Sequence, residues 1–253
     1  MLSLLLFLLY FLFSIGDCIW AEKRSHLRAG RLQPEDLTAL KRRIYTRRFR
    51  LLKFFLMPLL LGFYLSSSLL GWSLEAAFLP RSPLVSVIFA LIFGWGGDTL
   101  LELSPALFPF GLFSFLLGHI FYVTAFLTPR TGAISVLSFP TFSRAVFPLI
   151  LLLILVVYGV LMVRCLLFLP ETKKLRVPLM LYLVMLIVLL LSAGLYLNAG
   201  RNLGGLLCFL GAALFVISDS ILAFHLFTDR PDSGVMETYT SAQLLLVLGL
   251  LLP

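Results

Sequence analysis

The residues of this sequence best suited to catalysis or proton transport are ionisable side chains inside long apolar runs. The runs carry few charges, and the exceptions are Asp17, Asp98, His119, Asp219 and His225. A charge at the centre of a bilayer costs at least about 2.5–3.5 kcal/mol on the insertion scale, so such residues usually mark function. Two carboxyl groups in one apolar site suit proton transfer, either in acid–base catalysis or in proton-coupled transport.

Other polar residues accompany these groups at helical spacing. Pairs three or four residues apart are Asp98 with Glu102, His119 with Tyr122, and Tyr239 with Gln243. Such residues share one face of a helix. Ser218 directly precedes Asp219, and Gly211 lies two turns earlier, where a neighbouring helix can approach closely.

Each polar residue also has an ordinary structural interpretation. Asp98 near the end of a run is compatible with a hydrated interfacial carboxylate, and His119 with a hydrogen bond between helices. Asp219 lies deeper in its run, which favours function. For Asp17 and His225, both near run ends, a structural role is favoured.

The composition indicates which elements hold these residues. Of 253 residues, 60% are hydrophobic and 13% are charged, whereas soluble domains are roughly 45–50% apolar. Many apolar runs approach the roughly 20 residues that span a bilayer, and they are continuous rather than alternating. The sequence therefore predicts an all-α polytopic membrane protein, a bundle of about eight transmembrane helices.

The predicted spans are 1–20, 51–71, 83–101, 106–127, 144–169, 177–197, 203–227 and 238–253. Residues 131–142 are too short and too broken by proline for a clear span, and are either re-entrant or an extension of the fifth helix. The chain thus divides into a first transmembrane helix (1–20), a basic loop (21–50) and a seven-helix membrane core (51–253). The first span is expected to be retained, because it lacks the basic start and cleavage site of a signal peptide.

Positive charge orients the bundle. Eleven of the 20 Lys and Arg residues lie between Lys23 and Lys53, and basic loops stay in the cytoplasm. Both termini are then expected on the other side, and most of the polar residues fall in the inner half of the membrane, which predicts one polar cavity. A bacterial inner membrane and an endoplasmic reticulum membrane both fit. The basic block touches anionic lipid rather than nucleic acid, since no nucleic-acid fold accompanies it.

Metal and redox chemistry find little support in the sequence. Cys18, Cys165 and Cys208 are widely spaced and form no metal-binding pattern with histidine. We expect buried structural thiols, no metal and no cofactor.

Four segments in order resemble the YhhN family of membrane proteins, which includes lysoplasmalogenases. The matching residues are Gly97-Asp98, Gly118-His119 with Tyr122, Gly211-Ala212 with Ser218-Asp219, and Tyr239 with Ala242-Gln243. One departure concerns the family's Lys-Pro pair. Met57 precedes Pro58 here, and the nearest lysine is Lys53, a turn away.

The resemblance implies hydrolysis of the vinyl ether bond of a lysophospholipid, a lysoplasmalogen, to a fatty aldehyde and a glycerophospho-headgroup. Asp98 and Asp219 are expected to be the acid–base pair, with the two roles unassigned. Supporting residues are His119, Tyr122, Ser218, Tyr239 and Gln243, and Lys53 is expected to hold the headgroup phosphate. The roles of Glu102 and Asp17, the preferred headgroup and the oligomeric state stay open.

Three other functions are alternatives for a membrane protein with two intramembrane aspartates. An intramembrane aspartyl protease is disfavoured, because Trp95 stands where its G-x-G-D signature needs glycine and Ser218 stands where its partner aspartate needs tyrosine. A proton-coupled transporter lacks the expected inverted repeat. A non-catalytic lipid-binding protein is the third alternative.

Overall fold

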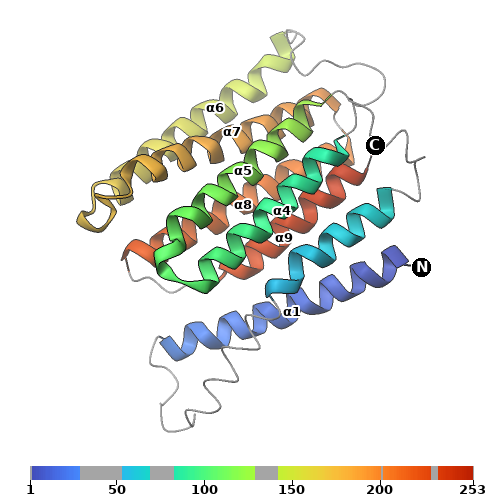
Figure 1. The fold of residues 1–253 in the computed structure, drawn as a ribbon. Helices are drawn as coiled ribbons and strands as arrows, with labels where there is room; N and C mark the ends of the chain where they lie inside the picture. Colours follow the sequence, from blue (N-terminus) through green and yellow to red (C-terminus); the bar gives the residue numbers. More distant parts are fainter. Residues whose placement is uncertain are drawn as a thin grey trace, which may run out of the picture.

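A computed structural model describes residues 2–28, 53–68, 83–128, 142–200, 202–228 and 233–252. The described residues are almost entirely helical and contain no strand, which confirms the all-α prediction (Figure 1). The helices are α1 (Leu2–Arg28), an unlabelled helix (Lys53–Ser68), α4 (Leu84–Leu103), α5 (Phe108–Leu127), α6 (Phe142–Met162), α7 (Arg176–Gly200), α8 (Leu203–Thr228) and α9 (Val235–Leu251).

These helices coincide with the eight apolar runs predicted from the sequence. Six of them are long and apolar enough to cross a membrane, and the Lys53–Ser68 helix and α9 are shorter apolar helices. Many large apolar side chains, such as Leu153 and Phe113, are exposed, as expected for a surface that faces lipid. The protein is therefore a multi-pass integral membrane protein.

The first helix is longer than predicted. We expected a loop from residue 21, but α1 continues to Arg28. Hydropathy locates where an apolar stretch ends, whereas a helix continues until its backbone is interrupted. Residues 21–28 hold neither glycine nor proline, and Gly30 is the first of either. The rest of the basic loop and most of the 131–142 segment lie outside the described residues.

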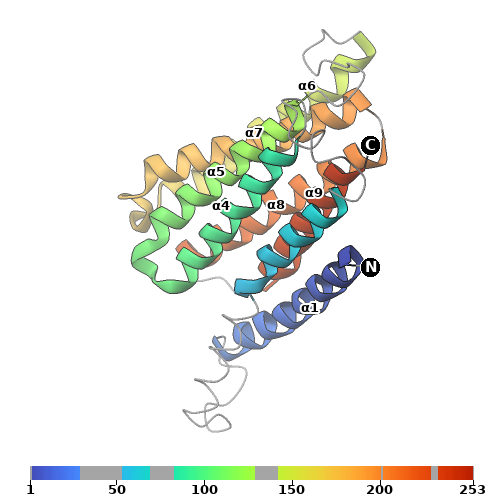
Figure 2. The same cartoon turned by 45° about the vertical axis from the view of Figure 1, so that its right-hand side comes forward.

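The helices form a bundle with α6 at one edge and α1 at the other (Figures 1 and 2). Within it, α4 packs on α5, α8 packs on α9, and α7 contacts both α5 and α8. The Lys53–Ser68 helix, drawn in cyan, lies between α1 and the rest of the bundle in both views. Ring contacts of Phe7 with Phe63 and of Phe13 with Phe55 join it to α1.

Small residues set the closest helix contacts. A Cβ at Gly249 of α9 would lie 2.6 Å from both Cys208 Sγ and the Gly204 carbonyl oxygen of α8. A Cβ at Gly118 of α5 would lie 3.2 Å from the Ala90 carbonyl oxygen of α4. Close backbone approach of this kind is the usual way that helices pack in membranes. It fixes α4 and α8, the helices that carry Asp98 and Asp219, against their neighbours.

The cysteines are only partly as expected. Cys208 is buried, Cys18 is half-buried, and Cys165 is exposed, in the short π-helix Val163–Leu167 that follows α6. The expectation of three buried thiols is therefore wrong for Cys165, because α6 lies at the edge of the bundle.

Replacing Gly249 by alanine is expected to destabilise the protein by about 1–3 kcal/mol, because the added methyl group overpacks the contact with α8. Gly62→Ala is the matched control, since a Cβ there would meet only the flexible Leu6 side chain, at 3.4 Å. Thermal unfolding of both variants in detergent measures the difference. Equal unfolding midpoints for the two variants would contradict the predicted overpacking between α8 and α9.

Candidate functional site

A cavity of about 700 Å³ lies among the helices and collects most of the polar residues singled out from the sequence. Its polar lining includes Lys53, Asp98, Tyr182, Ser218, Asp219 and Tyr239. Leucine, phenylalanine and methionine side chains form much of the remaining wall. The cavity thus presents the carboxyl groups of Asp98, Asp219 and Glu102 to a space that otherwise suits an apolar chain.

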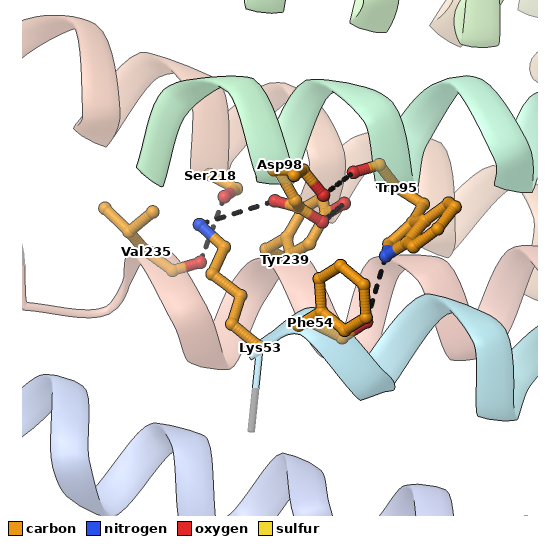
Figure 3. Close-up of polar contacts among 8 residues, drawn as sticks. Lys53, Phe54, Trp95, Asp98, Ser218, Val235 and Tyr239 are labelled. Atoms are coloured by element: carbon orange, nitrogen blue, oxygen red, sulfur yellow. Dashed lines mark hydrogen bonds and ion pairs between the residues drawn. The ribbon is translucent and has the colours of Figure 1, made fainter. Parts of the chain in front are cut away.

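Asp98 is held by groups from two other helices (Figure 3). Tyr239 Oη of α9 donates a hydrogen bond to Asp98 Oδ2 at 2.6 Å, and Lys53 Nζ lies 3.4 Å from Oδ1. The Asp98 side chain is only 5% exposed, so the ammonium group supplies the counter-charge that a buried carboxylate requires. Lys53 therefore reaches the site although it is not adjacent to Pro58.

Local sequence explains why Asp98 can sit there. It follows Gly96 and Gly97, and a Cβ at Gly97 would lie 2.7 Å from the ring of Phe115 on α5. The absence of a side chain at Gly97 lets this ring pack against α4. Phe115 lines the cavity and also makes an edge contact with the ring of Tyr239.

Asp219 has a different environment. Tyr182 Oη of α7 donates a hydrogen bond to Asp219 Oδ2 at 2.5 Å. Within the described part of the chain, Asp219 forms no ion pair. The next residue, Ser220, is hydrogen-bonded at 2.8 Å to Tyr158 of α6, which also lines the cavity. Asp98 and Asp219 therefore share one cavity, but among the described residues the cation of an ion pair lies beside Asp98 and not beside Asp219.

Ser218 links α8 to the start of α9. Its hydroxyl donates a hydrogen bond of 3.0 Å to the carbonyl oxygen of Val235, the first residue of α9. Gly234, which precedes α9, has a φ of 90°, a conformation that favours glycine. The Ser218 bond therefore ties the start of α9 to the helix that carries Asp219.

His119, Tyr122 and Gln243 are buried beside the cavity but do not line it. Tyr122 Oη donates a hydrogen bond to Gln243 Oε1 at 2.6 Å. The His119 ring packs edge-on against Phe215 and Tyr182, and neither ring nitrogen has a hydrogen-bond partner among the described residues. Of the predicted site residues, these three do not line the cavity, but the His119 ring contacts Tyr182, which does.

Sequence reasoning missed Tyr182 and Tyr158. Both lie in long apolar runs. A buried tyrosine usually finds a hydrogen-bond partner for its hydroxyl, so each was a detectable signal. Glu102 and His225, whose roles were left open or judged structural, also line the cavity.

Metal binding has no support in the described residues, which contain no group of three or more His, Cys, Asp or Glu side chains placed to hold an ion. The fold and the cavity define a helical multi-pass membrane protein with a largely apolar cavity that Asp98 and Asp219 both line. The chain belongs to the YhhN family, whose family model matches residues 49–250. Searches of curated proteins and of solved structures found no match.

The buried Tyr122–Gln243 hydrogen bond is expected to support the fold. Tyr122→Phe removes the donor and leaves the Gln243 carbonyl buried without it, which costs about 1–3 kcal/mol. Thr128→Val is the control, because the exposed Thr128 hydroxyl donates to the carbonyl oxygen of Thr124, one turn earlier in the chain. Thermal unfolding in detergent tests this, and an unchanged midpoint for Tyr122→Phe would contradict a supporting role.

Proposed function

We propose that this protein hydrolyses the vinyl ether bond of lysoplasmalogens, releasing a fatty aldehyde and a glycerophospho-headgroup. The observation that carries the proposal is the pairing of Asp98 and Asp219 in one largely apolar cavity, each carboxyl group holding a tyrosine hydrogen bond. Membership of the YhhN family supports a hydrolase of this type. A single-chain lipid suits the cavity, whose walls offer apolar contact for a chain and polar contact near the carboxyl groups.

The reaction needs an acid and a base at different moments. Protonation of the β-carbon of the vinyl ether uses the electron pair of the double bond and leaves an oxocarbenium ion. Water then bonds to the cationic carbon as a base removes its proton, which gives a hemiacetal. The hemiacetal loses its hydroxyl proton and expels the glycerol oxygen, which takes up a proton. Two carboxyl groups with opposite starting protonation states complete this cycle and return to their initial states.

The environments of the two carboxyl groups favour one assignment. The ammonium group of Lys53 favours the ionised form of Asp98, which suits a base and a carboxylate that stabilises the oxocarbenium ion. Asp219, with a tyrosine hydroxyl and no described ion pair, suits the acid that protonates the β-carbon. Tyr239 and Tyr182 orient the two carboxyl groups. The Lys53 ammonium has three donors, so it can bind a headgroup phosphate while it pairs with Asp98.

Asp98→Asn and Asp219→Asn are each expected to lower aldehyde release by about 10²- to 10⁴-fold, because each removes one proton-transfer group. The assay uses purified protein in detergent with a lysoplasmalogen, and the matching ester lysolipid serves as the substrate control. Glu237→Gln, which neutralises an exposed carboxylate in the first turn of α9, is the protein control and is expected to retain activity. Near-normal turnover by either aspartate variant would contradict the pair.

The same assay separates the other candidate functions. Release of aldehyde from the vinyl ether, with no fatty acid from the ester, supports the hydrolase. Binding of both lipids without any product supports a lipid-binding protein. Proton-driven uptake of solute into proteoliposomes, without hydrolysis, supports a transporter.

A further inference from the structure

Pro58 leaves one backbone carbonyl of the Lys53–Ser68 helix without its usual partner. In an α-helix each carbonyl oxygen accepts a hydrogen bond from the N–H four residues later. The residue four after Phe54 is Pro58, which has no N–H and whose ring crowds that carbonyl. The Phe54 side chain is 41% exposed, on the surface expected to face lipid, where no water replaces the missing donor. The Phe54 carbonyl oxygen therefore needs a donor from another helix.

Trp95 of α4 supplies that donor (Figure 3). Its indole Nε1 donates a hydrogen bond of 3.0 Å to the Phe54 carbonyl oxygen. The rings of Phe54 and Trp95 also pack edge to face, with their centroids 5.1 Å apart. A neighbouring helix that satisfies a backbone group freed by proline is a usual way for membrane helices to tolerate that residue. The bond and the ring contact join α4 to the first turn of the Lys53–Ser68 helix.

The Trp95 bond lies beside the ion pair of the site. Lys53 directly precedes Phe54 at the start of its helix. On α4, Asp98 follows Trp95 by three residues, within one helical turn. The indole bond and the 3.4 Å ion pair therefore bridge the same two helices at the same level. Helix ends fray unless a neighbouring group holds them, and Trp95 holds this end against α4.

We propose that Trp95 is a positioning residue that keeps Lys53 beside Asp98. It acts through the Phe54 carbonyl, which Pro58 leaves without an N–H donor. When this bond is lost, the first turn of the helix is released from α4, and the ammonium group is no longer held at a fixed distance from the carboxylate. The kinetic part of this inference rests on the proposed hydrolysis, whereas the two structural couplings tested below do not.

A thermal-unfolding cycle between Trp95 and Pro58 tests the hydrogen bond without any substrate. The full-length protein is purified in detergent as wild type, Trp95→Phe, Pro58→Ala and the double variant. Trp95→Phe keeps a ring against Phe54 but removes the N–H, and is expected to lower the unfolding midpoint by roughly 3 °C or more. In the Pro58→Ala background a backbone N–H replaces the indole donor, so the same substitution is expected to lower the midpoint by less than about 1 °C. Equal losses in the two backgrounds would overturn the inference.

A second cycle tests whether Trp95 acts on the ion pair. Trp95→Phe is combined with Lys53→Gln, or with Lys53→Met if the first variant does not purify. Because a released Lys53 has already lost much of its pairing with Asp98, the two midpoint losses are expected to fall short of additivity by roughly 2 °C or more. Ser66→Ala is the control and should add to Trp95→Phe, because the Ser66 hydroxyl donates within its own helix, to the Phe63 carbonyl oxygen. Additive losses for Trp95→Phe and the Lys53 variant would contradict the positioning role.

The kinetic arm distinguishes positioning from a purely structural role. Trp95→Phe is expected to lower kcat/KM for the vinyl ether about tenfold. The double variant with Pro58→Ala is expected to recover the unfolding midpoint but not kcat/KM, because its new N–H satisfies the carbonyl without joining the two helices. Unchanged kcat/KM in Trp95→Phe, or recovery of both quantities together, would overturn the positioning role. If wild-type protein releases no aldehyde, the proposed hydrolysis fails on its own, and the two unfolding cycles still decide whether Trp95 positions Lys53.

Discussion

A carboxylate and an ammonium group 3.4 Å apart inside a membrane bundle persist only if the surrounding helices hold them together. Each charge alone is expensive to bury, and loss of one partner leaves the other uncompensated. The Asp98–Lys53 pair meets this requirement because Tyr239 fixes the second carboxyl oxygen and the Gly97–Phe115 contact packs α4 against α5. The ion pair joins α4 to the Lys53–Ser68 helix, and the Tyr239 hydrogen bond joins α4 to α9.

The carboxyl group of Asp219 differs from that of Asp98 in its surroundings. Asp219 shares the cavity with Asp98 but has a tyrosine, not a cation, as its described partner. Two chemically identical side chains are thereby given different electrostatic environments. Such a difference is what allows one carboxyl group to donate a proton while the other accepts one. The proposed hydrolysis uses this asymmetry directly.

Much of the fold was predictable because apolar length and continuity largely determine which segments cross a membrane. The end of α1 was not, because charged residues that leave the apolar region still form helix up to Arg28. For the site, helical spacing and resemblance selected Asp98, Asp219, Lys53 and Tyr239, all of which line the cavity. Spacing on one helix says nothing about which other helix lies opposite.

That limit accounts for what the sequence did not show about the site. His119 and Gln243 match the family pattern as well as Asp98 does, yet both are buried and neither lines the cavity. Tyr182 carries a weak signal, yet it binds Asp219, because α7 packs beside α8. Asp17 was interpreted as a residue at a span end, whereas its side chain is fully buried in the bundle.

The position of a solvent deuteron in the product tests the central claim most directly. Purified protein is incubated with a lysoplasmalogen in deuterium oxide, and the aldehyde is trapped as it forms and analysed by mass spectrometry. Unlabelled aldehyde under the same conditions controls for exchange. Protonation of the β-carbon by a carboxyl group predicts one deuterium on the carbon next to the carbonyl. Aldehyde without deuterium at that carbon would contradict acid–base cleavage by Asp98 and Asp219.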